Sequence, residues 1–190
     1  MKKASWLTVI LGFPGLVLAG IWGFAEGTLF FIVPDLILTL TALFSIRRSI
    51  LQAIVVTMGA LLAGLLMFSW SEHNHIAASD AVMSVPLVRQ EMAQTVKESY
   101  SSYGASALLH GPLNGIPYKL YAIEAPQNTS LLTFLLMSVP ARMQRFLAAI
   151  LIAGLIGKWQ RARFQRSPKL ALSLWAGCWA LIYIAFIILI

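Results

Sequence analysis

Residues 131–157 read LLTFLLMSVPARMQRFLAAILIAGLIG, an apolar run that is interrupted by Arg142 and Arg145. A helix needs roughly 20 apolar residues to cross the hydrocarbon core of a bilayer, and this run is long enough. The two arginines lie near its centre and three positions apart, so they share one face of a helix. The run therefore predicts a transmembrane helix that carries two cations close to the middle of the membrane.

The composition of the whole chain places that helix in an integral membrane protein. Of the 190 residues, 59% are hydrophobic and 11% are charged, and the mean hydropathy is +0.80. Soluble domains have about 45–50% apolar and about 25% charged residues. A chain of this length has too little interior to hide so much apolar surface. The composition excludes a water-soluble globule, a disordered chain and a disulfide scaffold, and it predicts one all-α polytopic membrane domain over residues 1–190.

Two other charge-free runs, residues 49–71 and 170–190, are long enough to cross a bilayer. The run 28–46 is long enough only if Asp35 is tolerated inside it. The start of the chain also has a basic and then apolar pattern, so a cleaved signal peptide is an alternative for it. Against cleavage, the apolar pattern continues to Phe44 without a polar start for a mature protein.

The basic residues predict the orientation, because Lys and Arg concentrate in cytoplasmic loops. The loop 158–169 is strongly basic, and smaller basic clusters stand at Lys2-Lys3 and Arg47-Arg48. The segment 72–104 has only two basic residues against four acidic ones, so we expect it on the outer side. Within it, apolar residues at helical spacing predict an amphipathic helix over 84–103, with a Ser cap and a first-turn Pro.

This orientation predicts two hairpins. The segment 6–46 has cytoplasmic flanks on both sides, so it must enter the membrane and return with a bend near Gly23–Pro34. The apolar segment 105–125 is too rich in Gly and Pro for one straight helix, and we expect a re-entrant hairpin from the outer side. The residues expected to shape the hairpins are Pro34, Gly111, Pro112, Gly115 and Pro117.

Each expected hairpin precedes a spanning helix, 49–71 in the first half and 131–157 in the second. The halves begin on opposite faces of the membrane, and a C-terminal transmembrane helix follows at 170–190. The sequence thus predicts an inverted repeat of two opposed re-entrant hairpins. This architecture is common in secondary transporters, whose sites lie where the broken segments meet.

The charges at membrane depth are the candidate functional residues. A central Arg costs about 2.5–3.5 kcal/mol on insertion scales, so Arg142 and Arg145 need partners. Glu26 and Asp35 flank the first bend and are the expected partners. One alternative starts the helix after Pro140 and leaves the arginines at the interface; another lets them snorkel to it.

The chemistry of these groups allows two interpretations. The ion pairs can simply lock the fold. Alternatively, they line a polar cavity in which Glu26 and Asp35 carry protons and the arginines hold a phosphate, which suits their planar fork. Lys119 either attracts an anionic head group as well or snorkels outward beside Tyr118.

Three stretches, in order along the chain, resemble motifs of one membrane-protein family. They are EGTLFFIVPD at 26–35, GPLNGIPYK at 111–119 and RMQRF at 142–146. Together they resemble the DedA superfamily, also called the VTT-domain or SNARE-associated Golgi protein family, and in particular its YqaA-type branch. The resemblance covers roughly residues 20–160.

The resemblance implies opposed re-entrant hairpins and a role in lipid movement. The activities it implies are flipping or scrambling of phospholipids or, in bacterial members, recycling of the undecaprenyl phosphate carrier in dependence on the proton gradient. By matching position, the functional charged residues would be Glu26, Asp35, Arg142 and Arg145.

We therefore expect a lipid transporter that contributes to membrane homeostasis, located in a bacterial cytoplasmic (inner) membrane. Its expected partners are lipids with anionic phosphate head groups, bound by Arg142, Arg145 and Lys119; oligomers are possible and nucleic acid is not expected. A proton- or ion-coupled carrier of small solutes and a non-transporting organiser of the membrane are the alternatives. The chain has no phosphate loop, nucleotide signature or nucleophile elbow, and its three histidines lack metal-site spacing, so we expect no enzyme, cofactor or metal.

Overall fold

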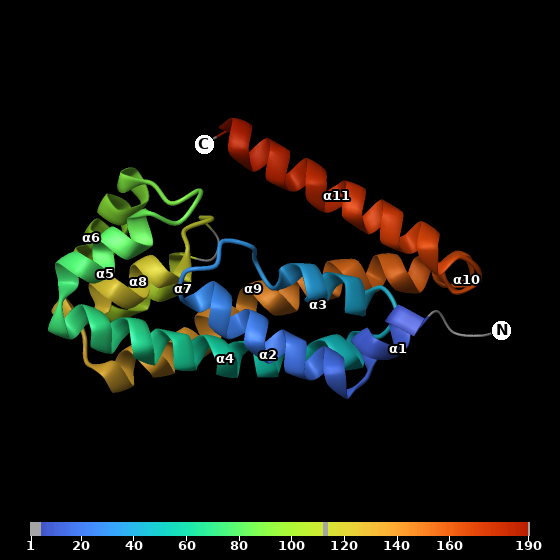
Figure 1. Cartoon of the computed structure of the whole chain (residues 1–190), viewed down its shortest axis with the longest axis horizontal. Helices are drawn as coiled ribbons and strands as arrows, with labels where there is room; N and C mark the ends of the chain where they lie inside the picture. The colour runs from blue at the N-terminus through green and yellow to red at the C-terminus, as the bar shows by residue number, and fades with distance from the viewer. Residues whose placement is uncertain (1–4, 112–113, 190) are drawn as a thin grey trace.

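Three long helices, α4, α9 and α11, dominate the computed structural model, which describes residues 5–111 and 114–189 (Figure 1). Within these residues the chain forms helices and loops and no strand. The helices are α1 Ser5–Leu11, α2 Phe13–Gly27, α3 Asp35–Ala42, α4 Ile46–His73, α5 His75–Met83, α6 Gln90–Tyr103, η1 Gly104–Ser106, α7 Ala107–His110, α8 Tyr118–Glu124, η3 Ala125–Gln127, α9 Leu131–Trp159, α10 Arg161–Arg166 and α11 Pro168–Leu189.

Each of the three long helices is long and apolar enough to cross a membrane. They cover the predicted spans 49–71 and 131–157 and all of the described part of 170–190, so the prediction of an all-helical membrane protein is confirmed at this level. α9 begins at a Ser130 cap, whose hydroxyl oxygen accepts from the Thr133 N–H, and it continues through Pro140. The alternative in which this helix starts after Pro140 is therefore wrong.

Helical structure is interrupted by a loop in both places where the sequence predicts a hairpin. Residues 28–34 connect α2 to α3, and a second loop connects α7 to α8. Gly115 in the second loop has φ +71°, a conformation that favours glycine. Pro112 lies outside the described residues, as do Lys2 and Lys3.

α2 lies directly against α4, because glycines let the two backbones approach. A Cβ at Gly23 would overlap the Val56 carbonyl, and a Cβ at Gly59 would overlap the Gly20 carbonyl. Small residues at such crossings are the usual means of close helix packing in membranes. The contact fixes the position of Glu26 at the end of α2 relative to α4.

The interior consists of two apolar clusters that meet part-way along α9. The first core combines the second half of α4 with α5, α6, α8 and the first half of α9, up to Ala141. The second core combines α2, α3, the first half of α4 and the second half of α9, from Phe146 onward. Arg142 and Arg145 lie between these two residues. The arginines thus occupy the boundary between the cores.

The segment 72–104 differs from its prediction. The helix predicted over 84–103 begins only at Gln90, and a separate helix, α5, precedes it. Residues after Ser84 form a turn, in which Leu87 has φ +71°. The apolar spacing is correct for the part that is helical, since Val96 and Tyr100 are buried in the first core.

α11 lies apart from the other long helices in Figure 1. Only 6% of its apolar window is buried within the chain, compared with 50% for α4. Most of its surface is therefore left for lipid or another chain.

Candidate functional site

The four charged residues expected to interact meet at the boundary between the two cores. Arg142 and Glu26 form the inner pair, with 2.5 Å between Arg142 Nη2 and Glu26 Oε2. Both residues are 4% exposed. Each charge is thus almost fully removed from solvent and relies on the other for compensation.

Arg145 and Asp35 form a second pair with a different character. Arg145 Nη2 lies 2.9 Å from Asp35 Oδ2, but that carboxylate oxygen has no partner with hydrogen-bond geometry among the described residues. The Arg145 side chain is 27% exposed, whereas that of Arg142 is 4% exposed. This second pair is close enough for Coulomb attraction, but it lacks the directional bond of the first.

Lys119, at the start of α8, connects that helix to the loop between α2 and α3. Its ammonium group donates to the Phe30 carbonyl at 2.7 Å, and the residue is 2% exposed. The alternative in which Lys119 snorkels outward beside Tyr118 is therefore wrong, because both residues are buried. Arg142 is buried as well, so the alternative in which it snorkels to the interface is also wrong.

The Tyr118 ring supports Arg142. The Arg142 guanidinium carbon lies 4.8 Å from the centre of the ring, a cation–π distance. The Tyr118 hydroxyl donates to Ser138 Oγ at 2.9 Å, and the ring stacks on Phe134. A Cβ at Gly64 would overlap the Tyr118 hydroxyl, so the glycine leaves room for this ring. This support was not predicted from the sequence, because no spacing pattern reveals it.

A cavity of about 280 Å³ opens beside the charged residues. Glu26, Asp35, Lys119 and Arg145 contribute its polar lining. Its apolar walls come from the loop between α2 and α3, the turn between α5 and α6, the loop before α8, and α11; they include Phe30, Phe31, Ile182 and Phe186. The cavity thus combines a charged floor with hydrocarbon-like walls.

Three side chains of α11 form polar contacts with the segment 33–39 beside this cavity. The Tyr183 hydroxyl accepts from the Val33 N–H at 3.1 Å, and the indole N–H groups of Trp175 and Trp179 donate to Thr39 Oγ1 at 3.1 and 3.0 Å. Thr39 in turn donates to the Asp35 carbonyl at 2.6 Å. The wall of the cavity is therefore connected to the segment that positions the Asp35 carboxylate.

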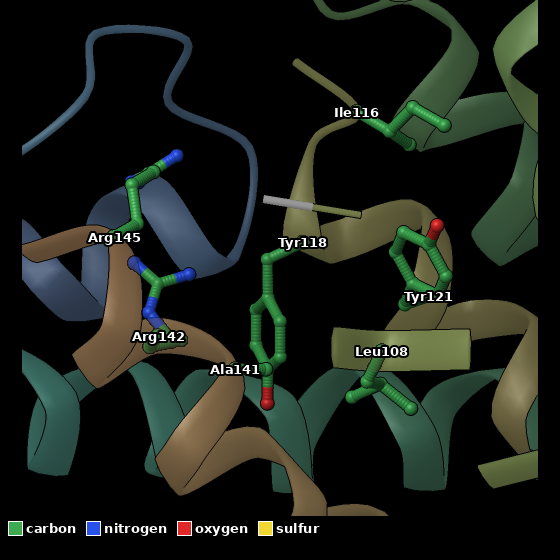
Figure 2. A pocket seen from close by; sticks show the side chains of 7 residues that line it. All are labelled: Leu108, Ile116, Tyr118, Tyr121, Ala141, Arg142 and Arg145. Carbon is green, nitrogen blue, oxygen red and sulfur yellow. The ribbon is translucent and has the colours of Figure 1, made fainter. Parts of the chain in front are cut away.

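A second, much smaller void of about 20 Å³ is lined by the side chains drawn in Figure 2, which are Leu108, Ile116, Tyr118, Tyr121, Ala141, Arg142 and Arg145. In this view both arginines extend from α9 toward the N-terminal segment drawn in blue, and the Tyr118 ring stands beside Arg142. The Nε atoms of Arg142 and Arg145 are buried without a hydrogen-bond partner among the described residues. A void of this size holds about one water.

The comparisons with known proteins add nothing to these contacts. The chain matches no family model, no curated protein and no solved structure.

A separate polar network lies where α4, α5, α6 and α8 meet. Ser71 Oγ lies 2.8 Å from His75 Nδ1, and His75 Nε2 lies 3.5 Å from the buried Glu124, which Lys97 also approaches at 3.8 Å. No Ser–His–acid set was predicted from the sequence, yet these residues are adjacent. The Ser71 hydroxyl donates to the Ile123 carbonyl at 2.5 Å and borders neither cavity. The arrangement joins α4 and α5 to α8.

Burial also affects a phenol in this region. It raises the pKa of Tyr100, whose hydroxyl donates to the Tyr121 carbonyl at 3.0 Å. In the described part of the chain, no group of three or more His, Cys, Asp and Glu side chains is arranged to hold a metal ion.

Proposed function

We propose that this protein moves lipids with anionic phosphate head groups across a membrane, with the head group passing through the cavity beside Arg145. In this proposal the segments around 28–34 and 111–117 are the tips of two opposed re-entrant hairpins. They belong to an inverted repeat, and the membrane is the cytoplasmic membrane of a bacterium. Two observations support this arrangement. They are the motif resemblance to the DedA superfamily and the loops that interrupt the helices between α2 and α3 and between α7 and α8.

The observation that carries the proposal is the composition of the cavity. A lipid has a charged head and apolar tails, and the cavity of about 280 Å³ offers both kinds of surface. The volume is close to the lower end for ligand pockets, about 300 Å³. It therefore suits a head group, while the tails extend along the aromatic and aliphatic walls toward the bilayer.

The charge balance of the site favours an anion. Two carboxylates, Glu26 and Asp35, face three basic side chains, Lys119, Arg142 and Arg145. Lys119 has only a neutral carbonyl as its hydrogen-bond acceptor among the described residues. One positive charge is therefore uncompensated in a low-dielectric place, where a phosphate would be stabilised strongly.

Arg145 is the group that we expect to bind the phosphate. It lines the cavity, its side chain is partly exposed, and its bond to Asp35 is poorly directed. A phosphate can displace the carboxylate and receive two parallel N–H bonds from the guanidinium. Asp35, released from its cation, is then the site at which a proton can be taken up, which would link lipid movement to a proton gradient.

Reconstitution tests the proposal. Purified protein in liposomes that contain a trace of fluorescent lipid should accelerate bleaching of inner-leaflet label by an external reductant. The assay should be repeated with phosphatidylglycerol, phosphatidylethanolamine and phosphatidylcholine, each with and without a proton gradient. Faster movement of lipid than in protein-free liposomes supports the proposal, and movement no faster than in protein-free liposomes for all three lipids contradicts it.

One observation favours a second function, that of a membrane organiser in which the charges only lock the fold. The Arg142–Glu26 pair is fully buried and faces a supporting ring, as expected for a structural lock. In that case no lipid moves in any assay, while neutralising Glu26 still destabilises the protein. A solute-driven proton flux without lipid movement would instead indicate a small-solute carrier.

A further inference from the structure

One end of the molecule carries a dense set of exposed basic side chains. We call it the basic end. All its basic residues are exposed, and none forms an ion pair with a carboxylate among the residues that the structure describes. Its members are Arg47, Arg48, Lys158, Arg161, Arg163, Arg166 and Lys169.

The fold brings these residues together from several helices. A Cβ at Gly157, at the end of α9, would overlap the Leu43 carbonyl just before α4, so the end of α9 lies beside the start of α4. α10 then connects α9 to the start of α11 at the same end (Figure 1). One end of each of the three candidate spans is therefore located here.

The charge distribution makes this end exceptional. The chain has 14 basic and 7 acidic residues, and its formal net charge is +7. The basic end has seven of those basic residues and no acidic one, so the other seven basic and seven acidic residues cancel. The seven positive charges of the basic end thus equal the formal net charge of the chain.

An aromatic side chain completes the surface. Trp159, between Lys158 and α10, is 83% exposed, whereas Phe164 of α10 is buried against the protein. Exposed Trp beside basic residues at the end of a spanning helix is typical of the head-group level of a bilayer. The buried Phe164 anchors α10 to the protein, and the arginines of α10 are exposed.

We propose that the basic end binds the head groups of anionic phospholipids in the adjacent leaflet. Clusters of four to eight Lys and Arg next to a transmembrane helix attract anionic lipids. Arginine adds two parallel hydrogen bonds to a phosphate, which a point charge does not. This surface is separate from the cavity, so the inference does not depend on the proposed transport.

Native mass spectrometry of the detergent-purified full chain tests the inference. The protein is titrated with phosphatidylglycerol or, separately, phosphatidylcholine, and bound lipids are counted. The wild type should retain phosphatidylglycerol in preference, and replacing Arg161, Arg163 and Arg166 with Gln should weaken that retention at least about tenfold, given the contribution of each base near a membrane surface. The exposed positions of these side chains predict little change in thermal unfolding.

Three controls determine whether the charge of the basic end is what retains the lipid. Replacing the same arginines with Lys should preserve most of the binding, because the charge stays. Arg89→Gln, at a partly exposed arginine between α5 and α6 and away from the basic end, should leave it unchanged. Higher salt should release phosphatidylglycerol from the wild type, which tests the inference even if the Gln variant fails to fold. Equal retention of the two lipids, or full retention by a folded Gln variant, would overturn it.

Discussion

The two arginines of α9 share one helix face and both lie over the Phe146 ring, but they differ in burial and in their carboxylate partner. Arg142 is buried, bonded to Glu26 and supported by the Tyr118 ring. Arg145 is partly exposed to a cavity, and its attraction to Asp35 lacks hydrogen-bond geometry. Two residues of one type, three positions apart, can thus have separate tasks. We interpret Arg142 as a fixed structural cation and Arg145 as the exchangeable, ligand-binding one.

Removing the buried arginine should have the largest effect on the fold. Arg142→Ala leaves Glu26 charged and unpaired at the boundary between the cores, so we expect a loss of about 3–5 kcal/mol in the free energy of unfolding. Denaturant or thermal unfolding in detergent micelles measures it. Replacing Arg142 and Glu26 together with Met and Leu should restore most of the stability. A loss below about 1 kcal/mol for Arg142→Ala would show that this pair is not a lock.

The next effect comes from the aromatic support of Arg142. Gly64→Ala adds a methyl group where the Tyr118 hydroxyl lies, so the ring must move away from its place beside the guanidinium. We expect a loss of about 1–3 kcal/mol from overpacking. Gly177→Ala is the matched control, because a Cβ there meets nothing within 4 Å and Ala favours the helix. Equal stability of the two variants would mean that Tyr118 is not held as described.

Arg145→Ala should have a smaller effect on the fold. Its pair with Asp35 is partly exposed and poorly directed, so we expect a loss of about 1 kcal/mol, near the upper range for exposed ion pairs. A double-mutant cycle with Asp35→Asn should give a weaker coupling energy than the cycle for Arg142 and Glu26. Coupling energies in the reverse order would exchange the tasks assigned to the two arginines.

The smallest expected change concerns the wall beside Arg145. Tyr183→Phe removes the acceptor for the Val33 N–H, and we expect a loss of about 0.5 kcal/mol. A spin label on Cys178, the one cysteine of the chain and an exposed residue of α11, should then report greater mobility of that helix. An unchanged spectrum would indicate that packing or lipid, and not this bond, holds α11.

Much of the fold could be predicted because hydropathy is a strong local signal. The three spans and the interruptions near Pro34 and between α7 and α8 follow from runs of apolar residues and from Gly and Pro. The start of α6 at Gln90 could not be predicted in the same way. Ser84 and Pro86 are good helix-start residues, but the chain turns there, with Leu87 at positive φ, before α6 begins.

The site was predicted only in part, for a related reason. The cost of an unpaired charge at membrane depth is general, so it identified Glu26, Asp35, Arg142 and Arg145 as residues that need partners. Which arginine is buried depends on how the two cores close around α9, and the sequence contains no pattern for that. Tyr118, Gly64 and the aromatic residues of α11 contribute through tertiary contacts alone.

The binding of the transported head group by Arg145 can be tested in a single comparison. Wild type and a folded Arg145→Ala variant are reconstituted at equal density, and the rate of transbilayer movement of phosphatidylglycerol is measured for each. We predict rapid movement with the wild type and a rate for the variant close to that of protein-free liposomes. A variant that moves lipid as fast as the wild type would show that Arg145 does not bind the head group during transport.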